Sequence, residues 1–91
     1  MSTPERLHVL VYDYVADVLE RRAPHREAHL AAIAEGKQAG RIVMGGAVGD
    51  PPHSAWIVFR DPADAERFAD ADPYVEAGLV TARRVEVWTV V

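Results

Sequence analysis

Two side chains capable of acid–base chemistry stand out in the sequence, His29 and Asp72. A histidine titrates near neutral pH, which suits proton transfer to and from a substrate. A carboxylate beside the imidazole would fix its tautomer and raise its basicity, as base–carboxylate pairs do in other enzymes. If the fold brings the two residues together in a pocket, they form a candidate pair for general acid–base catalysis.

Each residue also has a purely structural interpretation. His29 could be a partly buried helix histidine whose hydrogen bond is satisfied within the protein. Asp72 precedes Pro73, and an aspartate before proline is an ordinary helix N-cap. The two roles of Asp72 are compatible if one carboxylate oxygen caps the helix while the other faces the pocket. Asp72 also follows Phe68 by four residues, which places both on the same inward stripe.

Two further residues are candidates for substrate binding. Arg26 stands one helical turn before His29 and could bind a carboxylate or phenolate. The alternative is a surface ion pair between Arg26 and an acid such as Glu27 or Asp70. Tyr74 could line the same pocket, although an aromatic residue after Asp-Pro is also typical of a packing anchor.

A metal site is the weaker interpretation of the histidines. His25 and His29 are four residues apart, a spacing that metal ligands use on helices. A third ligand would have to come from His53 or Asp72. The segment His25-Arg-Glu-Ala-His29 lacks the glutamate that follows the first histidine in the helical zinc motif. We therefore expect neither a metal nor another cofactor.

Four strands and two helices are expected to position these residues. Apolar runs predict strands at residues 7–12, 41–48, 55–60 and 83–91. Helices are expected at residues 24–39, with Gly40 as its C-terminal cap, and at residues 61–71, where Asp61-Pro62 marks the start. The order β-α-β-β-α-β predicts a ferredoxin-like α+β fold, a four-stranded antiparallel sheet with two helices on one face. Residues 1–91 are expected to form a single domain.

The strands are apolar on both faces, although two helices cover only one. In the first strand, Leu7, Val9 and Val11 share one face and His8, Leu10 and Tyr12 share the other. We expect the uncovered face to receive Leu10, Tyr12, Trp56 or Ile57, and Trp88 or Val87. A large exposed apolar patch marks an interface, which predicts a homodimer packed through this open sheet face. On the first helix the expected apolar stripe is Leu30, Ile33 and Ala34.

The amino-acid composition limits the kinds of partner that this protein is expected to bind. The formal net charge is -4 without a long run of either sign, which argues against nucleic acid. The chain has no apolar run long enough to cross a membrane, and residues 1–6 are polar rather than signal-like. It also has no cysteine, which excludes disulfides and a thiol nucleophile. We expect a cytoplasmic protein that acts on a small molecule.

The sequence resembles the YCII-related family. The resemblance rests on Arg26-x-x-His29-Leu30, Gly40-Arg41, Gly45-Gly46, the segment ADADPYVEAG at residues 69–78 and Val85-x-Val87-Trp88, and it covers residues 7–91. It implies a ferredoxin-like fold that pairs into a dimeric α/β barrel. It also implies an active site built from His29 and Asp72, with Arg26 as a neighbour.

The resemblance also suggests a type of reaction. At least one relative removes chloride from a chlorinated hydroxyquinol, and related barrels include muconolactone isomerases. We therefore expect isomerisation or elimination on a small aromatic-derived or lactone-like substrate. The alternatives are a non-catalytic domain that binds a metabolite or a partner protein, and a structural homodimer in which the His–Asp pair only stabilises a helix end. The chain departs from some relatives in its short loop between the middle strands and in Ala47, which follows the glycine pair in place of a common proline.

Overall fold

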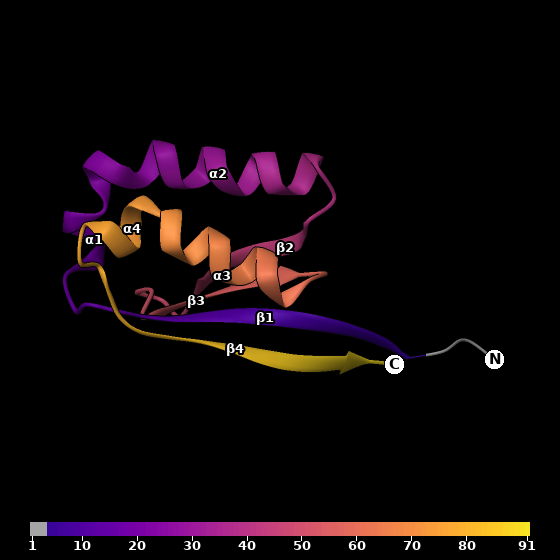
Figure 1. The fold of residues 1–91 in the computed structure, drawn as a ribbon. Coiled ribbons are helices and arrows are strands. Elements are labelled where there is room, and N and C mark those ends of the chain that lie inside the picture. The colour runs from indigo at the N-terminus through magenta and orange to yellow at the C-terminus, as the bar shows by residue number, and fades with distance from the viewer. Residues whose placement is uncertain (1–3) are drawn as a thin grey trace.

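The computed structural model describes residues 4–91 as an antiparallel sheet with helices on one face (Figure 1). The strands are β1 (Glu5–Tyr14), β2 (Ile42–Val48), β3 (Ser54–Phe59) and β4 (Val80–Val90), and the helices are α1 (Val18–Arg21), the 3-10 turn η1 (Ala23–His25), α2 (Arg26–Gln38), α3 (Pro62–Ala71) and α4 (Pro73–Glu76). The sheet order is β2-β3-β1-β4. This is the ferredoxin-like arrangement, so the predicted α+β fold is confirmed.

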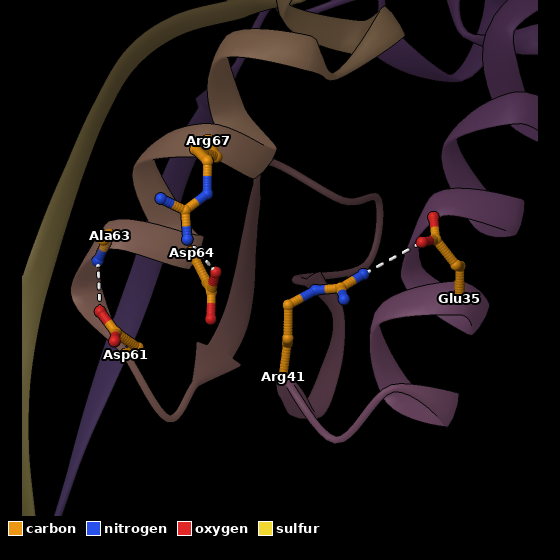
Figure 2. A network of polar contacts seen from close by, with 6 residues as sticks. All are labelled: Glu35, Arg41, Asp61, Ala63, Asp64 and Arg67. Atoms are coloured by element: carbon orange, nitrogen blue, oxygen red, sulfur yellow. Dashed lines mark hydrogen bonds and ion pairs between the residues drawn. The ribbon is translucent and has the colours of Figure 1, made fainter.

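The helix ends follow from local sequence chemistry. The side chain of Asp61 accepts a hydrogen bond from the Ala63 N–H at 2.8 Å and so caps α3, as Figure 2 shows. At the same end of the helical layer, Gly40 follows α2 with a φ of 78°, a conformation that glycine adopts without strain. Arg41 then donates to Glu35 at 3.1 Å across this turn (Figure 2). Pro24 lies in η1 rather than in α2, which begins at Arg26.

The two faces of β1 are assigned the opposite way from the sequence prediction. Leu10 and Tyr12 are 1% and 0% exposed and pack in the core under the helices, with Ala65 and Ala69 of α3. The uncovered face instead receives the other set, which consists of Leu7, Val9 and Val11. Both sets are apolar, so alternation separates them without showing which set faces the helices.

The strand register shows which of the remaining candidate residues lie on the uncovered face of the sheet. Trp56 lies opposite Val11 and Trp88 lies opposite Leu7, so both tryptophans are on the uncovered face. They are 53% and 46% exposed. Ile57 lies opposite Leu10 and belongs to the covered face. His8 is half-buried on that covered face, opposite Phe59 of β3.

The inward face of α2 is rotated by about one residue from the predicted stripe. Leu30 is 45% exposed and Ala34 is also exposed, while Ile33 is half-buried. The buried residues of α2 are His29 and Gly36. A Cβ at Gly36 would collide with the Ile42 side chain, so glycine lets α2 lie close to β2. The polar His29 therefore takes an inward position that an apolarity pattern assigns to Leu30.

None of the helices within residues 4–91 combines the length and hydropathy needed to cross a bilayer. The prediction of a single domain over residues 1–91 stays a prediction, and residues 1–3 of the polar N-terminal segment lie outside the described residues.

Candidate active site

The fold brings His29 and Asp72 into direct contact. His29 lies on the inner face of α2, and Asp72 lies at the junction of α3 and α4. His29 Nδ1 is 2.8 Å from Asp72 Oδ1, and the two residues are 5% and 1% exposed. A hydrogen bond of this length between groups withdrawn from water is stronger than its counterpart on the surface.

Three donors converge on the Asp72 carboxylate. Oδ1 faces His29 and also accepts the Tyr74 N–H at 3.0 Å, which makes Asp72 the N-cap of α4. Oδ2 accepts the Tyr12 hydroxyl at 2.9 Å. We expected one oxygen of Asp72 to cap the helix and the other to face the pocket. This expectation is wrong, because Oδ1 accepts the capping hydrogen bond and also contacts His29. Tyr12, on the central strand β1, holds the second oxygen and orients the carboxylate.

This arrangement determines which imidazole nitrogen can react. An ionised carboxylate accepts hydrogen bonds and donates none, so His29 Nδ1 must carry the proton of the His29–Asp72 contact. No hydrogen bond to Nε2 is found among residues 4–91, and Nε2 is not among their buried unpaired atoms. His29 itself lines a pocket. Nε2 is therefore the nitrogen available to accept or return a substrate proton.

Tyr74 holds the imidazole from one side. Its ring stacks on His29 with the centroids 3.8 Å apart and the planes inclined by 6°. Phe68 meets the imidazole edge-on, with a centroid distance of 6.2 Å. Tyr74 is 2% exposed, and within the described part of the chain its hydroxyl has no hydrogen-bond partner. A buried polar group of this kind is unfavourable unless a ligand or water satisfies it.

The pocket beside His29 has a volume of about 460 Å³ and lies between α2 and the β2–β3 hairpin. Arg26 lines it, together with Arg22, which the sequence analysis did not single out. The hairpin contributes Gly45 and the following residues to the opposite wall, and Tyr14 and Tyr74 lie along it as well. A space of this size suits a small ring compound.

Two of the site tyrosines are kept protonated by their surroundings. Burial raises the pKa of Tyr12, and the negative charge of Asp72 raises it further, so Tyr12 remains a hydrogen-bond donor. Burial also raises the pKa of Tyr14 to about 12, with a smaller opposing influence from the Arg22 and Arg26 guanidiniums. Tyr14 therefore offers the pocket an O–H donor at neutral pH.

The raised tyrosine pKa values predict that the folded protein loses stability in alkali. Between the ordinary tyrosine pKa of 10.0 and about 12, the unfolded chain ionises at Tyr14 while the folded protein keeps the proton. The stabilising contribution is thus complete below pH 10.0 and is lost as the pH rises towards about 12. Urea unfolding followed by tryptophan fluorescence should show this decline. It should be shallower in Tyr14→Phe, and an equal slope in both proteins would contradict the assignment.

The other candidate residues from the sequence, Arg26 and His25, do not share one location. Arg26 pairs with neither Glu27 nor Asp70 among the described residues, because Asp70 accepts a hydrogen bond from Arg83 instead. His25 lines a separate shallow groove rather than the pocket. Residues 4–91 contain no cluster of three or more histidine, cysteine, aspartate or glutamate side chains that could hold a metal.

Three contributors to the site escaped the sequence analysis, namely Tyr12, Tyr14 and Arg22. Tyr12 and Tyr14 both lie on β1, two residues apart and therefore on the same face, where alternation alone could have paired them. Arg22 follows α1 in a stretch with no clear periodicity, and it is four residues before Arg26. That spacing would have placed both arginines on one side had the helical character of the segment been evident.

Comparison with known proteins extends these observations. The model of the YCII-related domain family matches residues 7–89. A solved structure of 5-chloro-2-hydroxyhydroquinone dehydrochlorinase from Burkholderia phenoliruptrix AC1100, in complex with 2,5-dihydroxybenzoquinone, superposes with a TM-score of 0.73. The two sequences are 24% identical over 91% of this chain and 93% of the other, a likeness that shows the shared fold. A search of curated proteins finds no match.

Proposed function

The chain belongs to the YCII-related domain family, and from this premise we propose that it is an enzyme using His29 and Asp72 for acid–base chemistry. The observation that carries the proposal is the buried contact of 2.8 Å between His29 Nδ1 and Asp72 Oδ1. It leaves Nε2 available beside a pocket of about 460 Å³. The reaction class is isomerisation or elimination on a small aromatic-derived or lactone-like compound, and neither requires a cofactor.

Dehydrochlorination is the specific elimination that we propose, because the structural neighbour is a dehydrochlorinase of a chlorinated hydroxyquinol. In such a reaction a hydroxyl proton is first moved to the chlorinated ring carbon, which becomes tetrahedral. A conjugated hydroxyl then loses its proton to His29 Nε2, and the electron pair of the carbon–chlorine bond leaves with chloride. One HCl is lost in total and the ring becomes a hydroxyquinone, so no external oxidant is needed. His29 accepts and returns protons throughout.

The test is to offer the protein 5-chloro-2-hydroxyhydroquinone and follow chloride release and quinone absorbance. We expect release above the rate in buffer at neutral pH. Binding of 2,5-dihydroxybenzoquinone is measured in parallel by calorimetry. Binding without chloride release would favour the alternative of a non-catalytic metabolite-binding domain. Absence of both would contradict a pocket for this type of compound.

For the substrate contacts we propose Arg26 and Tyr74. Arg26 lines the pocket and forms no ion pair with the described residues, so its guanidinium is available for a carboxylate or phenolate. Tyr74 contributes the buried hydroxyl that lacks a partner and the ring stacked on His29. Both roles are supported by placement in the pocket. We keep the prediction of a cytoplasmic location as a prediction.

We further propose that two copies pair through the open sheet face. Within the described residues, β1 and β4 carry no helix on this side (Figure 1). Its exposed aromatic groups are Trp56 and Trp88, and Met44 adds a third large apolar side chain at 56% exposure. Arg84 and Glu86 lie 3.4 Å apart beside a hollow of about 340 Å³ lined by both tryptophans. A face with exposed apolar groups and charges of both signs is of the kind that pairs with its own copy across a two-fold axis.

Replacing Trp56 by lysine should therefore convert a dimer into a monomer, because a charge would be buried in an apolar interface. Sedimentation velocity at micromolar concentration measures the mass directly. Leu30→Lys is the matched control, since Leu30 is 45% exposed but lies on α2, away from the open face. The Leu30→Lys protein should remain a dimer. A wild-type chain that sediments as a monomer would contradict the interface.

A further inference from the structure

We propose that Arg22, Arg26 and the Tyr14 hydroxyl together form an anion clamp, so that the pocket selects small planar compounds bearing a delocalised oxyanion. The shared chemistry is that of a carboxylate or of the conjugate base of an acidic hydroxyquinone. The inference rests on the proposed function only in taking this pocket as the ligand site. It adds Arg22 and Tyr14 as specificity-determining residues and requires the ligand to be charged.

The first support is the state of the arginines. Arg22 is half-buried at the end of α1, Arg26 begins α2, and both line the same pocket as His29. Neither forms an ion pair within residues 4–91. Arg26 is exposed, so its guanidinium is open to a ligand, and two guanidiniums without ion-pair partners beside one cavity favour an anion there.

A second pocket supplies the contrast. It has a volume of about 440 Å³ between α2 and α3, and it is also lined by two arginines. There Arg41 is paired with Glu35 and Arg67 is paired with Asp64, as Figure 2 shows. Those guanidiniums are already neutralised by neighbours from the chain itself. The pocket beside His29 therefore differs in having cations without such partners.

Tyr14 adds a neutral donor to the two cations. Both guanidiniums lie near enough to influence the phenol electrostatically, and the phenol keeps its proton because burial raises its pKa to about 12. Its hydroxyl makes no hydrogen bond to a described residue. The ring lies edge-on to Tyr74, with centroids 6.2 Å apart, and Tyr74 in turn stacks on His29. Tyr14 is thereby connected to the imidazole through the ring of Tyr74.

One acid lines the pocket as well. Asp50 belongs to the hairpin loop and forms no ion pair with either arginine. Along the pocket wall two guanidiniums face the Asp50 carboxylate, and the buried Asp72 carboxylate behind His29 offsets the remaining positive charge. The preference for an anionic ligand therefore rests on the placement of two guanidiniums without ion-pair partners at the wall, and not on a net positive charge of the site.

The test compares two ring compounds that differ in charge. 2,5-Dihydroxybenzoquinone ionises readily because its conjugate base is delocalised, whereas 2,5-dimethoxybenzoquinone has the same ring and stays neutral. We expect the wild-type protein to bind the anionic compound more tightly, and Arg22→Gln to weaken that binding by about 10- to 100-fold, as for a lost hydrogen bond to a charged group. Weak binding of the neutral ether should be unchanged by the substitution. Arg21→Gln is the control, because Arg21 is the adjacent arginine and pairs with Asp17 at 3.7 Å.

The possible outcomes distinguish a failure of the anion clamp from a failure of the proposed reaction. Equal binding of the two compounds by wild type, no binding of either, or an Arg22→Gln protein with unchanged affinity would overturn the clamp. Chloride release by the Arg22→Gln protein at high substrate concentration would leave the proposed reaction intact. Charge-selective binding that depends on Arg22, without any chloride release, would uphold the clamp and contradict the reaction. Near-UV circular dichroism verifies that the variants are folded.

Discussion

Replacement of Asp72 by alanine should lower the free energy of unfolding by about 3–5 kcal/mol, the range for breaking one side of a buried charged contact. The carboxylate is 1% exposed and satisfies the Tyr12 hydroxyl, the His29 Nδ1–H and the Tyr74 N–H. Alanine would leave all three donors without this acceptor inside the protein. A small domain has only about 5–15 kcal/mol of stability in total, so the loss would be large. Urea unfolding at a fixed protein concentration measures it.

Asp70→Ala is the matched control for this prediction. Asp70 lies two residues earlier, is exposed, and forms a surface ion pair with Arg83 that keeps the pKa of that arginine above its usual value. Surface pairs contribute about 0–1 kcal/mol, so little should change. Asp72→Asn should fall between the two, because the amide keeps an acceptor oxygen and the Tyr12 hydroxyl can rotate to accept from its NH₂ group. An alanine protein as stable as the control would show that the convergence on Asp72 is not structurally important.

Replacement of His29 by asparagine should lower the rate of chloride release by about 10²- to 10⁴-fold, the usual contribution of a positioned acid–base group. The asparagine amide can still donate to Asp72 Oδ1 in place of Nδ1, so the buried carboxylate keeps a partner. It has no counterpart to Nε2 and cannot carry a proton. The loss should appear in kcat, whereas binding of 2,5-dihydroxybenzoquinone should weaken much less. Steady-state kinetics and calorimetry together separate the two effects.

His25→Asn is the companion variant. His25 stands one turn earlier, is half-buried, and lines a different groove. The same chemical change there should leave turnover within about twofold of wild type, as for a surface substitution away from the chemistry. If both variants retain full turnover, proton transfer by His29 is ruled out and the proposed mechanism fails.

The sequence pattern predicted the element order, and the YCII resemblance implied that His29 and Asp72 share a site, but neither predicted the faces that surround them. Helix caps and strand periodicity are local signals, and Asp61-Pro62 and Gly40 marked helix ends that the structure shows. By contrast, Leu10 and Tyr12 could be assigned to either face, because both faces of β1 are apolar. Only the tertiary contact with α3 distinguishes them.

The site was least predictable where a polar residue replaces an apolar one. Leu30 was expected on the inward apolar stripe, whereas the helix buries His29 and leaves Leu30 at 45% exposure. The hydrogen bond to Asp72 stabilises this rotation, and no pattern of hydrophobicity encodes a partner 43 residues away. The same limit explains why Tyr12 was missed, since its contact with Asp72 spans 60 residues.

The sheet order β2-β3-β1-β4 has a consequence for how such a protein can diversify. The tyrosine that orients Asp72 comes from the interior strand β1, whereas the glycine-containing pocket wall comes from the edge strand β2. Insertions and side-chain changes in an edge strand and its loop disturb few long-range contacts. Descendants of one ancestral chain could therefore acquire new substrates by remodelling β2 and the following loop while the proton-transfer apparatus stays constant. For the protein engineer, β2 and the loop at residues 49–53 are accordingly the segment to randomise first.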